Sequence, residues 1–364
     1  MVLFYILGTV VFINCAYFFL FSKFSLLKKT ELVCTNSQPV SLIVCAKNEA
    51  KNLEKHIPLW LNQAYNNFEL ILINDASIDE SLEVMERFSA KDPRIQIVNV
   101  RNNEAFWGNK KYALTLGIKK AKYNLLVFTD ADCYPASPKW LTIMASKFSS
   151  EKKIVLGYGA YEKRKGFLNK LIRFETLMTA IQYLSYAKAD MPYMGVGRNL
   201  AYTNKVYTSN NGFMSHIKVV SGDDDLLVNE AATTKNTAIC VNDEGFTYSL
   251  PKETFRNWIK QKARHYTTAK RYKAKHRFLL GFFYISNLAF WILSTIVLFT
   301  PLWKEGLVLI AFRLILQYII IGKGAKKLKE ADLIFFIPFF ELFLVLTQLS
   351  IFISNSGSKQ QQWK

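Results

Sequence analysis

The 364-residue chain is 51% hydrophobic and 15% aromatic, and its apolar residues are concentrated towards both ends, which indicates a membrane protein with a soluble middle. Its net charge of +19 suits an anionic membrane surface, a phosphorylated substrate or nucleic acid. The five cysteines have no paired spacing and the four histidines are scattered, which argues against a disulfide framework, a structural zinc site and an oxidising compartment.

The chain begins with a candidate membrane anchor. Residues 2–21 contain no charged side chain and are long enough to cross a bilayer as a helix. Lys23, Lys28 and Lys29 follow this segment instead of preceding it, and no small-residue cleavage site is evident. We therefore expect an uncleaved anchor over residues 1–24, with its carboxyl end in the cytoplasm by the positive-inside rule.

Residues 38–250 alternate short apolar runs with amphipathic segments. The runs that we interpret as strands are residues 40–46, 68–73 and 95–100 and a fourth that begins at Leu125, with a helix predicted after each of the first three. This alternation predicts an α/β domain with a mostly parallel sheet, of the class that binds nucleotides.

Polar side chains follow three of these strands. Asn48 and Glu49 come after the first, Asp75 ends the second, and Asp130 and Asp132 end the fourth. Ligands bind at the carboxyl ends of the strands in open α/β sheets, so these side chains are expected to share one cleft. Two carboxylates suit Mg²⁺ or Mn²⁺, which take oxygen ligands, and an acid after a strand can bind a ribose or a base edge. The alternative for each acid is turn chemistry.

Two later features could serve the same cleft. Lys110 opens a predicted helix and could meet a diphosphate, although a solvated surface lysine is the commoner case. The run Asp223, Asp224 and Asp225 precedes an apolar segment. One of these acids could cap a helix, but three exceed that need, so we expect a general base among them. The glycines at 195 and 197 indicate that the backbone approaches another group closely there.

Residues 255–278 hold nine lysines and arginines and no acid. We interpret residues 251–277 as a basic helix at the bilayer interface, held by anionic headgroups. Nucleic-acid binding is the alternative for such a run. We set nucleic acid aside because the run leads directly into a membrane segment.

Three further apolar segments predict three transmembrane helices within residues 278–354, at 278–298, 306–321 and 333–353. Arg313 in the middle segment should face protein and not lipid. Four lysines within residues 322–329 place that loop in the cytoplasm. The catalytic domain then lies on the cytoplasmic side of a bacterial-type inner membrane, and the tail at 355–364 lies outside.

In this order, the motifs resemble those of the membrane-bound family 2 glycosyltransferases, over roughly residues 40–272 and the anchoring helices around them. The matching segments are residues 41–49 (SLIVCAKNE), 74–79 (NDASID), 108–114 (GNKKYAL), 129–132 (TDAD), 222–224 (GDD) and 261–265 (QKARH). The resemblance implies a GT-A catalytic domain over residues 38–250, with a mostly parallel mixed sheet, one membrane helix before it and three after it.

The resemblance also implies an inverting transfer from a nucleotide-diphospho-sugar, a UDP- or GDP-sugar, with Mg²⁺ or Mn²⁺ as cofactor. Asp132 and Asp130 match the metal-binding motif. Asp224 matches the catalytic base, although the run of three acids leaves Asp223 and Asp225 open. The residues that match donor-binding positions are Asn48, Glu49, Asp75, Lys110, Asp130, Gln261 and Arg264.

The expected acceptor is a lipid or a lipid-linked glycan, because the basic segment and the membrane helices hold the site near the bilayer. A processive polysaccharide synthase is the alternative. His265 stands where such synthases carry a tryptophan that contacts the acceptor, which argues against processive polymerisation. A non-catalytic membrane scaffold with the same fold is the more distant alternative.

Overall fold

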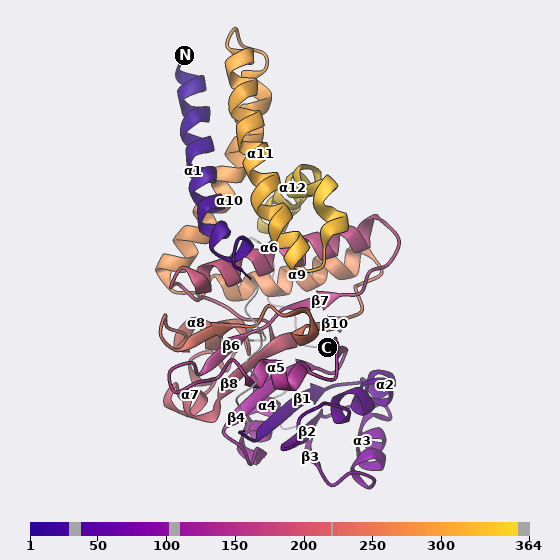
Figure 1. Ribbon diagram of the computed structural model, residues 1–364. Coiled ribbons are helices and arrows are strands. Elements are labelled where there is room, and N and C mark those ends of the chain that lie inside the picture. The colour runs from indigo at the N-terminus through magenta and orange to yellow at the C-terminus, as the bar shows by residue number, and fades with distance from the viewer. Residues whose placement is uncertain (29–37, 102–109, 220, 356–364) are drawn as a thin grey trace.

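The protein is arranged in three layers. The computed structural model describes residues 1–28, 38–101, 110–219 and 221–355. Figure 1 shows an α/β domain at the bottom, two long helices lying across the middle, and membrane helices rising above them. The motif residues Gly108 and Asn109 and the predicted tail after residue 355 lie outside the described residues.

A seven-stranded mixed sheet forms the centre of the domain, in the order β3-β2-β1-β4-β8-β6-β9. Strands β1 to β4 run parallel, whereas β8 runs antiparallel to both β4 and β6. The mostly parallel mixed sheet expected from the sequence is therefore confirmed. The strands span β1 Val40–Ala46, β2 Phe68–Asp75, β3 Ile95–Val100, β4 Leu125–Asp130, β6 Ile154–Leu156, β8 Leu200–Thr203 and β9 Thr237–Ile239.

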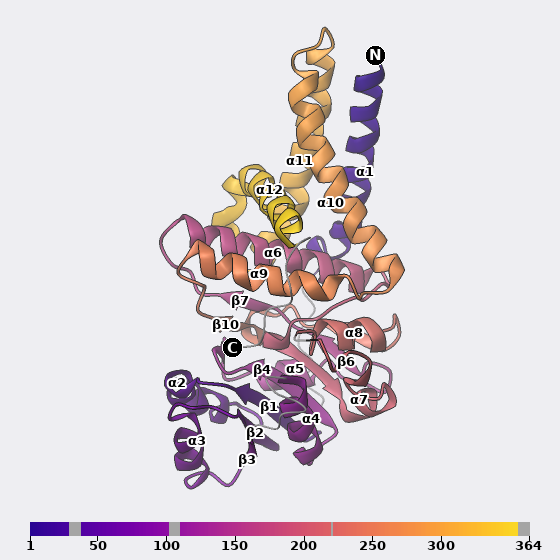
Figure 2. The same ribbon diagram turned by 180° about the vertical axis from the view of Figure 1, so that it is seen from behind.

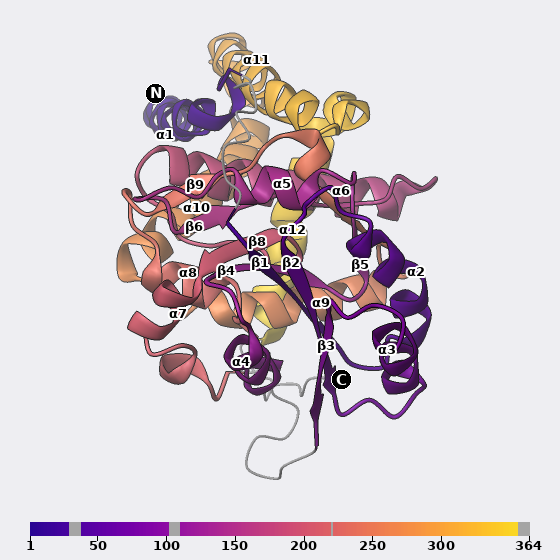
Figure 3. The ribbon, with the colours of Figure 1, turned by 60° about the horizontal axis from the view of Figure 1, so that its bottom comes forward.

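Helices cover both faces of this sheet, so its central strands are apolar at nearly every position. Alternate strand residues enter two separate cores: Ile43 and Phe128 face one side, and Leu42 and Val127 face the other. Figure 3 shows α4 on one side and α2 and α3 on the other. The domain helices span α2 Ala50–Leu61, α3 Ser81–Ser89, α4 Lys110–Lys120, α5 Trp140–Ala145, α7 Asn204–Ser209 and α8 Asp225–Ala231.

A second, three-stranded sheet, in the order β5-β10-β7, lies between the large sheet and the middle layer of helices (Figure 1). It comprises β5 Cys133–Pro135, β7 Gly159–Tyr161 and β10 Thr247–Ser249. Residues 154–159 (IVLGYG) form one short run without charged residues in the sequence. The structure divides this region between β6 of the large sheet and β7 of the small one, because residues 157 and 158 leave the first ladder.

The middle layer consists of α6 (Phe167–Lys188) and α9 (Phe255–Ala269), which lie side by side in Figures 1 and 2. Helix α9 ends at Ala269 and α10 begins at Ala274, so the basic segment contains one helix and the start of the next. Phe18, Phe21 and Leu177 belong to the same buried cluster as Ile43 of the sheet. One apolar core therefore runs from the sheet through α6 into the membrane helices.

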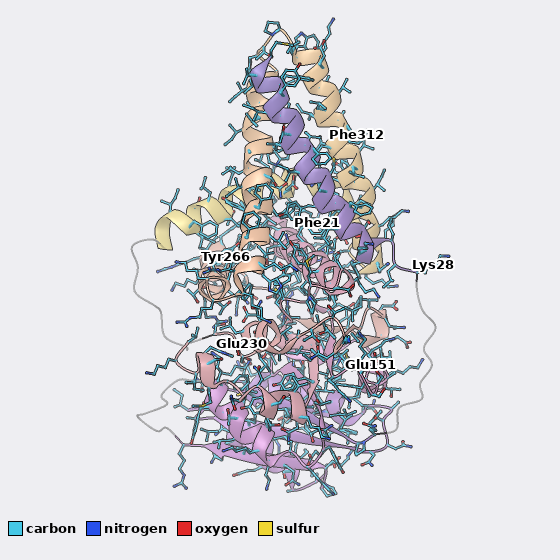
Figure 4. The ribbon with its side chains drawn as sticks, turned by 90° about the vertical axis from the view of Figure 1, so that its left-hand side faces the viewer. Phe21, Lys28, Glu151, Glu230, Tyr266 and Phe312 are labelled. Carbon is cyan, nitrogen blue, oxygen red and sulfur yellow. The ribbon has the colours of Figure 1, made fainter. Side chains whose placement is uncertain are left out.

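Among the described residues, four helical segments are long and apolar enough to cross a membrane, one before the domain and three after it. They correspond to α1 Val2–Ser25, α10 Ala274–Val297, α11 Trp303–Lys327, and α12 Ile337–Asn355 together with the 3₁₀ turn before it. Figure 4 shows α1, α10 and α11 rising from the domain, whereas α12 lies across them close to Tyr266 of α9. Phe352 of α12 packs against the ring of Tyr266, with 5.7 Å between ring centroids.

Candidate active site

Two carboxylates mark the carboxyl end of β4, at the centre of the sheet. Asp130 is the last residue of β4 and lies opposite Cys45 of β1, and Asp132 follows one residue later. Ligand atoms of Asp130, Asp132 and Cys133 lie within 4.8 Å of one another. Carboxylate oxygens suit Mg²⁺ or Mn²⁺ better than the thiol does, so the two acids fit a hard divalent cation.

The electrostatics of this pair favour a cation. Burial, followed by the neighbouring charge of Asp130, raises the pKa of Asp132 above its ordinary value. Two carboxylates this close repel each other, and a positive charge between them would relieve the repulsion. The chemistry of the side chains therefore fits the metal site expected from the sequence.

Lys110 connects the two acidic centres of the sequence. Its Nζ lies 2.8 Å from Asp130 Oδ1 and 3.0 Å from Asp223 Oδ2, and its side chain is 13% exposed. Burial lowers the pKa of Lys110, but the two carboxylates outweigh burial and raise it well above its usual range. The structure thus brings together acids that are almost a hundred residues apart, and Lys110 is buried between them, which rules out the alternative of a solvated surface lysine.

The three successive aspartates have three different environments. Asp223 pairs with Lys110, whose charge outweighs the effect of burial and lowers the pKa of Asp223. Asp225 is buried, and its Oδ2 accepts hydrogen bonds from Thr268 Oγ1 at 2.5 Å and Tyr272 OH at 2.6 Å. These two acids are therefore engaged by other side chains.

Asp224 is held by backbone instead. Its Oδ2 accepts the N–H of Gly197 at 2.6 Å, and its Oδ1 accepts the N–H of Asp225 at 2.8 Å. Burial, and then the charges of Asp223 and Asp225, raise the pKa of Asp224 to about 7. A half-buried carboxyl with a pKa near neutrality can accept a proton from a bound hydroxyl.

One glycine allows this arrangement. Gly222 has a φ of +97°, and a Cβ there would lie 2.5 Å from Leu226 Cδ1 of α8. Gly222 therefore permits the turn into α8. A Cβ on Gly197 would lie 3.4 Å from Asp224 Oδ2, which is an ordinary van der Waals distance.

The end of β2 forms the next part of the site. Asp75 is 6% exposed, and its Oδ2 has no hydrogen-bond partner among the described residues. Burial raises the pKa of Asp75, and the charges of Lys47 and Lys110 oppose this effect. A buried carboxylate oxygen without a donor is costly, and it can accept a hydrogen bond from a bound ligand.

Asn48 and Glu49 brace the turn that follows Asp75. Asn48 has a φ of +58°, and its Oδ1 accepts the N–H of Ile78 at 2.9 Å. The N–H of Glu49 donates to Ser81 Oγ at 2.8 Å, and burial raises the pKa of the Glu49 carboxyl. Both residues therefore connect the end of β1 to the turn that follows Asp75.

Gln261 and Arg264 lie on α9, one turn apart. Gln261 Nε2 donates to Tyr161 OH of β7 at 3.3 Å. Lys262 Nζ pairs with Glu175 Oε1 of α6 at 2.5 Å, and this ion pair fixes α9 against α6. Gln261 thus contacts the small sheet, and α9, which carries both residues, lies above that sheet in Figure 1.

Arg198 was not singled out from the sequence. It lies in the 3₁₀ turn Gly197–Asn199, stacks on Tyr161 at 4.3 Å from Cζ to the ring centroid, and donates to Ser249 Oγ at 3.1 Å. Burial lowers its pKa, but neighbouring groups, Tyr161 first and Asp132 among them, outweigh this and raise it. The glycines beside Arg198 drew attention to this segment, but no local pattern places its side chain near Asp132.

Residues 41–209 match the family described as Glycosyl transferase family 2. This segment, slightly less than half of the chain, is therefore similar to the family 2 glycosyltransferases. The matched segment contains β1 to β8, and therefore the ends of β1, β2 and β4 that carry Asn48, Asp75, Asp130 and Asp132. Asp224 and α9 follow this segment.

Individual relatives cover part of the chain. An uncharacterised glycosyltransferase of Haemophilus influenzae is 37% identical over 106 residues, which is 29% of this chain and 31% of the relative. The poly-β-1,6-N-acetyl-D-glucosamine synthase of Staphylococcus aureus is 28% identical over 132 residues, 36% of this chain and 30% of the synthase. These matches span about a third of the length of those family 2 relatives.

A solved structure extends the likeness to nearly the whole chain. The mannosyltransferase PcManGT of Pyrobaculum calidifontis, in complex with GDP-mannose and Mn²⁺, has a TM-score of 0.61 and 16% sequence identity. The alignment covers 94% of this chain and 98% of that protein. At this identity the likeness shows a common GT-A fold, which agrees with the fold expected for a family 2 enzyme.

Proposed function

We propose that the protein is a membrane-anchored inverting glycosyltransferase that moves a sugar from a nucleotide-diphospho-sugar to an acceptor hydroxyl. The observation that carries this proposal is the position of Asp224. Its carboxyl is held by two backbone N–H groups, has a pKa raised to about 7, and lies next to Asp223, which Lys110 connects to Asp130.

Asp224 is the general base of the proposed reaction. The oxygen of the acceptor hydroxyl forms a bond to the anomeric carbon, and its proton passes to the Asp224 carboxylate. The bond from the anomeric carbon to the donor diphosphate breaks on the opposite side, and the nucleoside diphosphate leaves. A single displacement of this kind inverts the configuration at the anomeric carbon. Asp223 and Asp225 position the loop, since each is engaged by other side chains.

Asp132 and Asp130 would hold Mg²⁺ or Mn²⁺. When bound, the ion neutralises the charge that develops on the leaving diphosphate. Lys110 keeps Asp130 oriented and adds a positive charge between the acidic centres. Arg198, close to Asp132, and Arg264 of α9 are further cations available for the phosphates. The Mn²⁺ in the mannosyltransferase of the same fold supports this assignment.

The donor nucleotide would occupy the cleft at the ends of β1 and β2. The unpaired carboxylate oxygen of Asp75 can accept hydrogen bonds from a base or a ribose. Asn48 and Glu49 shape the adjoining turn, and Gln261 would contact the donor from α9. A UDP- or GDP-sugar is the proposed donor; the mannosyltransferase of the same fold is in complex with GDP-mannose.

The proposed acceptor is a lipid or a lipid-linked glycan. Helices α6 and α9 lie between the α/β domain and the membrane helices (Figure 2), and Thr268 of α9 contacts Asp225. An acceptor headgroup next to α9 would therefore lie close to the acidic loop. The basic residues of α9 and of the start of α10 suit anionic headgroups. The lysines near the end of α11 support a cytoplasmic location for the domain, by the positive-inside rule.

Processive polysaccharide synthesis is the second candidate, favoured by the similarity to the poly-N-acetylglucosamine synthase. A synthase adds many sugars to one acceptor, whereas a simple transferase adds one. The length of the product in vitro separates the two reactions. We expect single additions, since His265 replaces the tryptophan of the synthase motif.

The test is turnover of a panel of UDP- and GDP-sugars with Mg²⁺ or Mn²⁺, in detergent with added lipid extract. We expect one donor to be consumed by wild type and to be lost in Asp132→Asn and Asp224→Asn. Asp190→Asn is the matched control, because Asp190 is exposed and its φ of +63° is tolerated by asparagine. Absence of donor binding by calorimetry would contradict the enzyme and support a scaffold.

A further inference from the structure

Helix α4 begins with two successive lysines that have different partners. Lys110 contacts the side chains of Asp130 and Asp223. Lys111 contacts backbone of the segment that leads to Asp223. The family motif accounts for one lysine, at position 110, and assigns nothing to Lys111.

Lys111 is 1% exposed. Its Nζ donates to three carbonyl oxygens, those of His216 at 3.0 Å, Val219 at 2.7 Å and Ser221 at 2.6 Å. An ammonium group has three N–H donors, and each of these contacts is within hydrogen-bond distance. A buried, charged side chain thus binds three carbonyl groups of one backbone segment.

The backbone that Lys111 binds leads directly to the acidic residues. Ser221 is followed by Gly222, whose positive φ turns the chain, and then by Asp223, Asp224 and the start of α8. The direction of the Asp224 carboxylate therefore depends on where the carbonyls before it are held. On the other side, Thr268 and Tyr272 hold Asp225. Lys111 of α4 holds the backbone before Gly222 from the opposite side.

We propose that Lys111 is a positioning residue for the reaction: it fixes the backbone before Gly222 and so sets the place of the Asp224 carboxylate. This inference rests on the proposed role of Asp224 as base. Lys110 and Lys111 together connect α4 to the acidic loop in two ways, through side chains and through backbone. A hydrocarbon side chain at position 111 would leave three carbonyls without this donor.

The first test measures the backbone and needs no substrate. Hydrogen–deuterium exchange is compared in the full-length, detergent-solubilised wild type, Lys111→Met and Lys111→Gln. Lys119→Met is the matched control, because Lys119 is exposed near the end of the same helix. We expect exchange at residues 213–219 and 221–225 to rise at least tenfold in Lys111→Met and less in Lys111→Gln, which keeps an amide donor. The control and the peptides of β1 to β4 should exchange as in wild type.

The second test separates positioning from general stability. With whichever donor the panel identifies, we expect kcat of Lys111→Gln to fall on the order of 10- to 100-fold, since small displacements of a catalytic group are costly. The KM for the donor should stay within about twofold, because Asp75 and the metal acids are untouched.

Two results would overturn the inference. One is exchange of residues 213–219 and 221–225 at the wild-type rate in Lys111→Met, which would mean that Lys111 does not hold this backbone. The other is a rise in exchange with an unchanged kcat, which would reduce Lys111 to a structural role. If Lys111→Met does not fold, Lys111→Gln decides both points. Because the exchange test requires no donor, it stands apart from the panel that tests the proposed function.

Discussion

Neighbouring residues in this site differ in chemistry because their partners come from different parts of the fold. Asp223, Asp224 and Asp225 are consecutive, yet they contact α4, the turn before β8 and α9 respectively. The first is paired with a lysine, the third accepts two hydroxyl groups, and the middle one retains a carboxyl whose pKa is raised to about 7. Such a division would let one short loop supply the proposed base and hold it in place.

The raised pKa of Asp224 predicts the pH dependence of the reaction. A general base acts in its deprotonated form, so kcat should be lost as the pH falls through about 7 and should be constant above it. The charge of Asp225 helps to raise this pKa, so Asp225→Asn should move the acidic limb of the profile to lower pH. The measurement is kcat against pH for wild type and Asp225→Asn. A limb that stays in place would argue against Asp224 as the group that titrates.

At the scale of elements, α9 is the connection between the acidic loop and the membrane. Its residues Gln261 and Lys262 contact β7 and α6, and Thr268, in its last turn, reaches Asp225. Phe352 of α12 packs on Tyr266 in the same helix. A displacement of α9 in the bilayer interface would therefore be transmitted to the loop that carries Asp224.

The contact between Tyr272, just after α9, and Asp225 can be tested by Tyr272→Phe. The change removes a 2.6 Å hydrogen bond to a buried carboxylate and leaves the ring in place. A hydrogen bond to a charged group contributes about 1.5–3 kcal/mol, so we expect the free energy of unfolding to fall by about that amount. Denaturant unfolding in detergent measures it, with Tyr5→Phe as control, since Tyr5 is 62% exposed. Equal stability of the two variants would show that the hydroxyl contributes little.

At the scale of the whole molecule, one buried arginine joins all four apolar helices. Arg313 of α11 is fully buried and donates to Asn14 of α1, Asn287 of α10 and Glu341 of α12, at 3.0, 2.8 and 2.8 Å. Its guanidinium also lies 4.3 Å from the ring centroid of Phe290. The arginine therefore faces protein, as its position in an apolar segment predicted, and it ties α12 to the other three helices.

Loss of this arginine should destabilise the membrane region. Arg313→Met leaves Glu341 buried without its partner, and breaking a buried pair in this way costs about 3–5 kcal/mol. Thermal unfolding in one detergent should show a lower Tm for Arg313→Met. Adding Glu341→Leu should restore most of the loss, because a hydrophobic replacement of the whole pair is often neutral. A double variant as unstable as Arg313→Met alone would mean that Glu341 is not the source of the cost.

Local patterns in the sequence were sufficient for much of this architecture. The ends of β1, β2 and β4, the apolar membrane segments and the motif residues at 48–49, 75, 110 and 130–132 follow from runs of neighbouring residues, because strand burial and helix length depend on nearby side chains. The gathering of these strand ends at one edge also follows, since parallel strands in register end together.

Only the tertiary structure decided which of the three acids is held by backbone N–H groups, where Lys111 and Arg198 lie, and that α12 crosses the other membrane helices. Each depends on contacts between residues far apart in the chain: Asp224 with Gly197, Lys111 with Ser221, Arg198 with Ser249, and Arg313 with Glu341. A hydrogen bond of this kind forms when the fold brings donor and acceptor within about 3 Å of each other. The spacing of residues along the sequence does not predict which distant donor and acceptor come together.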